Sequence, residues 1–442
     1  MKKLLFILLL MACFGLAQAN SIAGGEITYE HVGTVTQPYL YKIKLNLYRT
    51  YKPGVVKYDT TVSIDINSTC YGPKTLVLKR IVPPPLEDAG DGGFAMERAN
   101  NCIDTADTNI VFISEHRYED TITLGGKCAD FRFSYTSCCR DTSFTNFQRN
   151  LADTIFLDAW LNNTRRPNNS VVFNDDPLVN VCLSKPVRMS YQCTDADGDS
   201  LVYDIWRPQT DQNTWMNWAA GYTIHNPVQS LGGFNLNIRT GIAEFQPAIV
   251  EQDILMIKVE EYTYDTFLQL YYQVGVVKRE ARLNIVSSCS NPTLSPLFHS
   301  DAANIDTSAR FYCNDQIIEL KLNYEIQVDR IAKDGSNFRL VDVKNNSPIP
   351  IVEAGALNPV YSGLYTKEVW IKTFLPITRN DTFDLSIKPG LQGTKLITSC
   401  EHEFTTGMVR LVVDDCQPVF SIHENELLQE VLAYPNPVGN VL

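Results

Sequence analysis

Three aspartates stand on alternate positions in TDADGDSLVYDIW, residues 194–206. Asp195, Asp197 and Asp199 carry like charges, which repel at this spacing unless water or a cation screens them. Ca²⁺ prefers six to eight oxygen ligands, and a loop of closely spaced aspartates supplies several of these. Gly198 permits the tight turn that such a loop needs. The segment therefore predicts a calcium site immediately before a β-strand.

The remaining ligands of this site must come from elsewhere in the chain. An EF-hand does not fit, because the glycine comes too early and Trp206 stands where the bidentate glutamate belongs. We predict Glu260 and Glu261, in the segment KVEEYTYD, as further metal ligands. Other candidate carboxylates are Asp175, Asp176 and Asp265. The alternative is that the aspartates only accept hydrogen bonds from backbone amides in a turn.

Three tryptophans, Trp206, Trp215 and Trp218, lie close together in a polar segment, residues 206–222. Flat aromatic rings stack on the apolar faces of sugars and also anchor protein interfaces. This pattern predicts a ligand-binding surface, with a polysaccharide as the ligand. The alternative is that one or two of the rings fill a β-sandwich core.

Catalytic motifs are missing from the sequence, and we predict that the chain is not an enzyme. It contains no H-E-x-x-H, no G-x-S-x-G and no phosphate-binding glycine loop. His116, His225 and His299 lack metal-ligand spacing, so we expect them at the surface or in turns. A hydrolase whose carboxylate pair assembles only in space remains an alternative. The net charge of −12 argues against a nucleic-acid partner.

Residues 1–19 combine a basic start, a short apolar run and the sequence Ala17-Gln18-Ala19, which predicts a cleaved secretory signal peptide. A lipoprotein signal that ends at Cys13 is the alternative. No later segment is long and apolar enough to predict a transmembrane helix.

Export changes what the cysteines predict. Eleven of the twelve cysteines follow residue 19. In an oxidising compartment most of them should form disulfides. Because their number is odd, one cysteine should remain a free thiol or pair with another chain. By proximity in sequence we expect Cys182 to pair with Cys193, and Cys313 with Cys400 or Cys416.

The elements that position these residues are predicted as β-strands. In YLYKIKLNLYRT, apolar residues alternate, so that Tyr41, Ile43, Leu45 and Leu47 share one face of a strand. No long stretch has helical periodicity. The predicted fold class is all-β, with tandem Ig-like or cadherin-like β-sandwiches. The predicted division is a signal peptide at 1–19, β-sandwiches at 20–165, 166–288 and 289–417, and a linker with a further domain start at 418–442.

Several segments together resemble a known family. SIAGGEITYEHVG, YKIKLNLYRT, FRFSYTSCCRD, SVVFNDDPLVNVC and DADGDSLVYDI occur in the order found in Bacteroidota cell-surface proteins described as gliding-motility-associated or adhesin-like. DADGDSLVYDI, followed by LNIRTGIAEFQP and ILMIKVEEY, is similar to cadherin-like and Ig-like modules. The resemblance covers roughly residues 21–290 and implies a surface location.

The segment LAYPNPVGNVL resembles the start of a type IX secretion sorting domain, through Tyr434, Pro435, Asn436 and Pro437. The resemblance implies the type IX secretion machinery as a partner and the outer-membrane surface as the destination. We expect the sequence to continue after Leu442. Together these patterns predict an exported adhesin-like or structural protein, stiffened by calcium, whose surface partner is a glycan or a protein.

Overall fold

The computed structural model describes residues 22–50, 59–96, 110–138, 140–149, 154–177, 179–287, 289, 309–399, 401, 403–404, 407–414 and 416. The predicted signal peptide and the predicted sorting motif at residues 434–437 lie outside the described residues.

Strands account for nearly all regular structure, and the described residues form no α-helix. The chain begins with β1 (Ile22–His31), β2 (Leu40–Thr50), β3 (Thr61–Asn67), β4 (Lys74–Arg80), β5 (Phe94–Ala95), β6 (Ile113–Thr123), β7 (Phe131–Cys138) and β8 (Thr154–Leu161). It continues with β9 (Val172–Phe173), β10 (Asn180–Cys182), β11 (Val187–Ser190), β12 (Cys193–Thr194), β13 (Ser200–Trp206), β14 (Gln209–Asp211), β15 (Thr214–Trp215), β16 (Asn235–Leu236), β17 (Ile242–Phe245), β18 (Gln252–Asp265) and β19 (Leu270–Val286). The predicted all-β fold class is confirmed.

The last part of the described chain contains two short 3₁₀ turns, η2 (Val328–Arg330) and η3 (Leu391–Gly393). Its strands are β20 (Ala309–Phe311), β21 (Ile317–Gln327), β22 (Phe338–Asp342), β23 (Ser347–Ile349), β24 (Ile351–Leu357), β25 (Tyr365–Thr373), β26 (Asp381–Ile387), β27 (Leu396–Ile397), β28 (Glu403–Phe404) and β29 (Met408–Val413).

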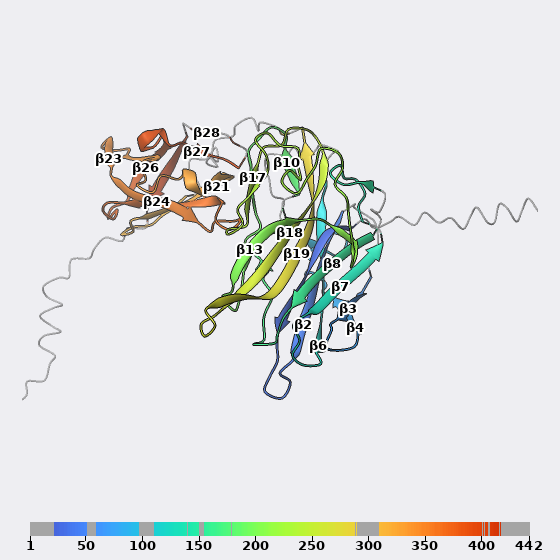
Figure 1. Ribbon diagram of the computed structural model, residues 1–442. Coiled ribbons are helices and arrows are strands. Elements are labelled where there is room, and N and C mark those ends of the chain that lie inside the picture. Colours follow the sequence, from blue (N-terminus) through green and yellow to red (C-terminus); the bar gives the residue numbers. More distant parts are fainter. Residues whose placement is uncertain are drawn as a thin grey trace, which may run out of the picture.

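Residues 22–287 fold around one large sheet, in the order β13-β18-β19-β1-β2-β6-β4-β3-β7-β8-β14-β15. A further pairing of β8 with β19 closes part of this path on itself. Two β-layers therefore face each other and are joined at both edges (Figure 1). The core lies between them, where the ring of Tyr29 on β1 lies 5.4 Å from that of Phe133 on β7. On β2, Tyr41, Ile43 and Leu45 are buried on alternate positions, as their spacing predicts.

The predicted boundary at residues 165/166 does not separate two cores. Residues from Ile22 to Ile285 contribute to a single buried cluster. Strands β1 and β8, from the predicted first domain, both pair with β19 from the predicted second. Arg279 on β19 also forms a buried bidentate ion pair with Glu26 on β1, at 2.8 and 3.0 Å. Without β19, strands β1 and β8 would each lose a hydrogen-bonded neighbour. The two predicted units therefore form one body.

Residues 309–416 have a separate core and two four-stranded sheets, β20-β21-β25-β24 and β23-β22-β26-β29. Phe311 and Phe383, one from each sheet, meet in this core with ring centroids 6.0 Å apart. Figure 1 shows this unit beside the end of the main body that carries β10 and β17. Contacts between the described residues of the two parts include the backbone N–H of Ser362, which donates to Asp175 at 3.1 Å, and the ion pair of Arg188 with Asp329 at 3.1 Å.

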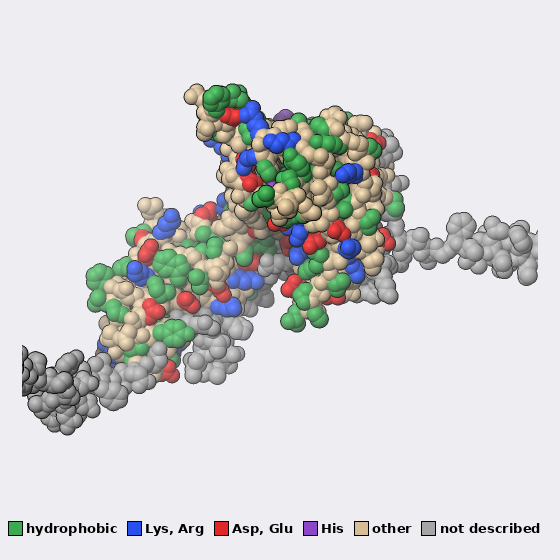
Figure 2. Space-filling model, turned by 90° about the horizontal axis from the view of Figure 1, so that it is seen from below, with side chains coloured by type: hydrophobic (Ala, Val, Ile, Leu, Met, Phe, Trp, Pro, Cys, Tyr) green, Lys and Arg blue, Asp and Glu red, His purple; other side chains and the backbone are tan. Residues whose placement is uncertain are grey.

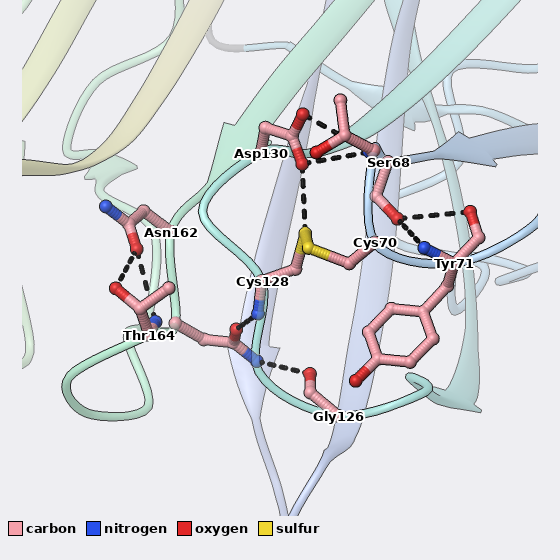
Figure 3. The surroundings of a disulfide bond; sticks show 10 residues. Ser68, Cys70, Tyr71, Gly126, Cys128, Asp130, Asn162 and Thr164 are labelled. Carbon is pink, nitrogen blue, oxygen red and sulfur yellow. Dashed lines mark hydrogen bonds between the residues drawn. A yellow bond between two sulfur atoms is a disulfide. The ribbon is translucent and has the colours of Figure 1, made fainter.

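Disulfides cross-link positions far apart in the sequence. Cys70 and Cys128 join the β3–β4 turn to the segment before β7 (Figure 3), and the N–H of Cys128 is held by Asn163 Oδ1 at 2.7 Å. The other described pairs are Cys182–Cys289 and Cys313–Cys416. The second confirms one of the predicted alternatives for Cys313. The predicted Cys182–Cys193 pair is wrong, because Cys182 is carried beside the end of β19 by β10, and Cys193 keeps a free thiol.

Candidate metal site

The aspartate loop is a turn closed by Asp195. Its Oδ1 accepts the backbone N–H groups of Asp197 and Asp199, each at 2.9 Å. Gly198 takes a φ of 75°, which a glycine adopts without steric cost. The predicted turn chemistry is therefore present, but it uses only one oxygen of Asp195.

The sheet brings a carboxylate from another strand to this loop. Strand β13 starts directly after the loop and pairs antiparallel with β18, so that Leu201 lies opposite Glu261. As a result, Asp195, Asp199 and Glu261 each offer one carboxylate oxygen, and these three oxygens lie within 4.8 Å of one another.

Glu261 is fully buried. Its Oε2 accepts a hydrogen bond from Asn168 Nδ2 at 2.7 Å, and its Oε1 accepts the N–H of Val171 at 3.1 Å. Gly275 on β19 leaves room for this carboxylate, since a Cβ at that position would lie 2.3 Å from Oε2. Burial raises the pKa of Glu261 to about 8, and the nearby negative charges of Asp195 and Asp199 add to the rise.

Three buried oxygens around this cluster have no hydrogen-bond donor among the described residues: Asp195 Oδ2, Asp199 Oδ2 and Asn168 Oδ1. Asn168 is fully buried, and the side chain of Asp199 is only 2% exposed. A buried polar atom without a partner costs about 1–3 kcal/mol. Carboxylate and amide oxygens are the ligands that Ca²⁺ takes, so a hard cation would satisfy these atoms.

One cation, Arg166, neutralises part of the charge. Its Nη2 lies 2.5 Å from Asp199 Oδ1, and its Nη1 lies 3.7 Å from Asp197 Oδ1. Thr263 also donates its hydroxyl to Asp199 Oδ1. Burial raises the pKa of Asp195, and the like charges of Asp199 and Asp197 contribute. A single guanidinium therefore faces more than one carboxylate.

Two of the predicted ligands lie outside this cluster. Asp197 accepts hydrogen bonds from the backbone and side chain of Asn169, at 2.6 and 3.1 Å. Glu260 follows the alternation of β18 to the other face, where it meets Lys258 at 3.1 Å. Of the five predicted ligands, the structure brings together Asp195, Asp199 and Glu261.

The other candidate carboxylates also have separate partners. Asp265 pairs with Arg165, and Asp175 accepts from Ser362. Asn168 was not predicted, and its place in the sequence, far from the aspartate loop and from Glu261, gives no signal of this role.

The three tryptophans do not form one stacking surface. Trp206 packs under the ammonium of Lys258, 4.1 Å from the ring centroid. Trp218 stacks on Phe147 at 4.2 Å, while Trp215 on β15 is 38% exposed. Within the described part of the chain, no ring contact joins any two of Trp206, Trp215 and Trp218.

A second group of potential metal ligands and the position of His116 lie apart from this cluster. Cys70, Cys128 and Asp130 also cluster, but Cys70 and Cys128 are joined in a disulfide and so do not offer thiolates to a metal. His116 was expected at the surface or in a turn and is instead buried on β6, where Ser114 Oγ lies 3.2 Å from its Nε2. The surface expectation for His116 is wrong, because its strand faces the loop that contains Asp91.

Comparisons with known proteins do not identify the chain. It matches no protein-family model and no curated protein. Among solved structures, one described as "Structural basis for Dscam isoform specificity" has a TM-score of 0.14 and 8% identity, and covers 88% of this chain and 91% of its own. The S-layer protein rSbsC(31-844) has a TM-score of 0.15 and 9% identity, and covers 92% of this chain and 56% of its own. Similarities this low support no argument about function.

The described residues contain no helix with the length and apolar character needed to cross a bilayer. Acidic and basic side chains are intermixed on the face shown in Figure 2.

Proposed function

We propose that this chain is an exported structural or adhesin-like protein of a bacterial cell surface, in which Ca²⁺ stiffens the body formed by residues 22–287. The observation that supports this proposal is the cluster of carboxylate oxygens from Asp195, Asp199 and Glu261 within 4.8 Å of one another. Asp195 Oδ2, Asp199 Oδ2 and the nearby Asn168 Oδ1 are buried without a donor among the described residues. The proposed role is mechanical and not catalytic.

Calcium would connect three separate parts of the body. Asp195 and Asp199 belong to the loop before β13, Glu261 lies on β18, and Asn168 lies between β8 and β9. Bridging these parts opposes their separation, because a ligand that binds only the folded state stabilises it. The ion would also offset the like charges that a single arginine balances only in part.

Export is supported by the sulfur chemistry. The three described disulfides close loops with sequence separations of 58, 107 and 103 residues. Such bridges persist in oxidising compartments and are rare in the cytosol. The resemblance of residues 434–437 to a type IX sorting motif supports the outer-membrane surface as the destination.

The test is a thermal unfolding curve recorded in a chelator and again in millimolar Ca²⁺. We expect Ca²⁺ to raise Tm, with a stabilisation of about 2.7 kcal/mol when its concentration is 100 times Kd. Glu261→Gln should lose most of this increase, since it replaces a charged ligand with a neutral amide.

Glu260→Gln is the matched control, because its side chain lies on the opposite face of the same strand. It should keep the full increase in Tm. An unchanged Tm in wild type, or equal responses of the two variants, would contradict the proposed calcium site.

A further inference from the structure

The hairpin between β18 and β19 extends past the strands on either side of it (Figure 1). The pairing of β13 with β18 ends at Tyr262, and that of β8 with β19 ends at Gly275. Residues 263–272 pair only with each other beyond these points. We call this segment the hairpin tip.

The hairpin tip exposes an unusual amount of apolar surface. Phe267 at its apex is 91% exposed. The other exposed apolar and aromatic side chains are Tyr264, Leu268, Leu270 and Tyr271. Figure 2 shows hydrophobic side chains gathered on a projection of the molecule. Monomeric proteins rarely expose apolar side chains in such a cluster unless it makes contact with something.

The tip is held in a defined shape. Asp265 Oδ1 accepts the backbone N–H groups of Phe267 and Leu268, each at 2.9 Å. The rings of Tyr264 and Tyr271 meet across the hairpin, with centroids 4.9 Å apart. The apolar side chains are therefore presented on a closed turn, and the amides of Phe267 and Leu268 at its apex already have an acceptor.

The tip carries almost no net charge. Asp265 is the one charged residue in the sequence of residues 263–272, and Arg165 forms an ion pair with it. The guanidinium of Arg165 also lies 4.5 Å from the ring centroid of Tyr272. The negative charge of Asp265 is thus neutralised by Arg165, at the point where the hairpin tip extends from the main body.

From this geometry we propose that the hairpin tip inserts into the surface of a lipid bilayer. Phe267 and Leu268 occupy the apex, and tyrosines follow toward the body, at Tyr264, Tyr271 and Tyr272. Tyrosine favours the bilayer interface, while Phe and Leu favour the acyl region. Bilayers favour backbone whose polar groups are satisfied, and here the strands are paired up to Asp265 and Leu270 while Asp265 accepts the amides of Phe267 and Leu268.

A bilayer fits the tip better than a second copy of the chain does. The exposed aromatic and aliphatic side chains amount to on the order of 500 Å², whereas a stable protein interface needs about 800 Å² from each partner. A fluid bilayer requires no complementary surface and can surround a projection from all sides. The net charge of −12 opposes anionic lipids and favours neutral ones.

The experiment is flotation of the protein with phosphatidylcholine vesicles in the presence of a chelator, so that its outcome does not depend on the calcium site. We expect the wild-type protein to float with the vesicles. The double variant Phe267→Ser with Leu268→Ser should bind at least roughly tenfold more weakly, because it removes two side chains from the acyl region. Phe267→Trp should retain binding and report a blue shift of its emission.

A second exposed Phe-Leu pair provides the matched control. Phe374 and Leu375, after β25, are 61% and 65% exposed. Phe374→Ser with Leu375→Ser should float as the wild type does. The proposal is wrong if the wild type stays in the aqueous fraction, or if both double variants bind equally. It is also wrong if sedimentation shows a dimer that only the tip variant loses while no protein floats.

Discussion

Strand β18 carries a buried carboxylate cluster near each end, and the two clusters differ in the number of carboxylates and in the positive charge beside them. At its start, Asp253 shares a hydrogen bond with Glu251, and both are buried. Thr145 donates to Asp253 at 2.9 Å, and Gln229 donates its N–H to Glu251 at 2.7 Å. At the other end, Glu261 meets two aspartates, one of which pairs with the guanidinium of Arg166. Each cluster has carboxylate oxygens that receive no hydrogen bond from the described residues: Asp253 Oδ2 at the start of β18, and Asp195 Oδ2 and Asp199 Oδ2 at the other end.

This difference shows two ways to bury acidic groups. Two carboxylates share one proton when a single negative charge remains and hydroxyl or amide donors surround it. Burial and, to a smaller extent, the charge of Glu251 together raise the pKa of Asp253 to about 9. The cluster at the other end combines a carboxyl of raised pKa, Glu261, with two aspartates and a single guanidinium, that of Arg166.

The largest expected effect concerns pH. Asp253 stays protonated in the folded chain up to pH about 9, whereas its unfolded pKa is about 4. The folded state therefore binds more protons than the unfolded state between these values, so stability falls as pH rises through this window, by on the order of a few kcal/mol. Asp253→Asn, which mimics the protonated acid, should flatten the dependence of the free energy of unfolding on pH.

Urea unfolding at pH 5 and pH 8.5 measures this effect. The exposed Glu353→Gln serves as the control and should follow the wild-type pH dependence. An Asp253→Asn curve as steep as that of wild type would show that Asp253 does not hold the proton.

The second effect concerns Asp195, at the other end of β18, where one substitution should change stability in opposite directions with and without Ca²⁺. Asp195→Asn removes one of several like charges and keeps an oxygen for the turn amides, so it should stabilise the chain by about 1 kcal/mol in a chelator. In excess Ca²⁺ the same variant should be less stable than wild type, because it lacks a charged ligand.

Asp253→Asn is the comparison for this prediction, measured by chemical unfolding at pH 8. It should change stability by the same amount with and without Ca²⁺, because its cluster lies at the opposite end of β18. If Asp195→Asn changes the free energy of unfolding in the same direction with and without Ca²⁺, no ion binds at the Glu261 end of β18.

The smallest effect concerns the hydroxyl donors. Thr145→Val removes the donor to Asp253 and should cost about 1 kcal/mol whether or not Ca²⁺ is present. Thr263→Val removes the donor to Asp199, and its cost should be smaller in Ca²⁺, because the ion would satisfy that carboxylate. Paired measurements of the free energy of unfolding, with and without chelator, check this difference; equal costs in both conditions for Thr263→Val would argue against an ion at Asp199.

Much of the local structure follows from the sequence. Alternation predicts the buried face of β2, and on β18 it also distinguishes the two glutamates. From Ile257 onward burial alternates: Ile257, Val259 and Glu261 are buried, whereas Lys258 and Glu260 are only partly buried. Predicting both as ligands ignored this period of two, since neighbouring residues of a strand face opposite ways.

The long-range arrangement does not follow from the sequence in this way. Nothing local shows that β1 and β8 both pair with β19, so turn spacing suggested a domain boundary where the core is continuous. Asn168 reaches Glu261 only because the two layers meet there. Disulfide pairing fails for the same reason, because Cys182 is nearer to Cys193 in sequence but lies beside Cys289 in space.

The bridge between Cys313 and Cys416 has a consequence for a chain that is pulled. These cysteines stand near the first and last described positions of the C-terminal unit, with a sequence separation of 103 residues and Cα atoms 4.9 Å apart. A tensile load that enters at one cysteine leaves at the other through covalent bonds, and the enclosed strands carry none of it. Without the bridge, unravelling these residues would let the chain lengthen by about 350 Å; with it, this unit behaves as an inextensible link.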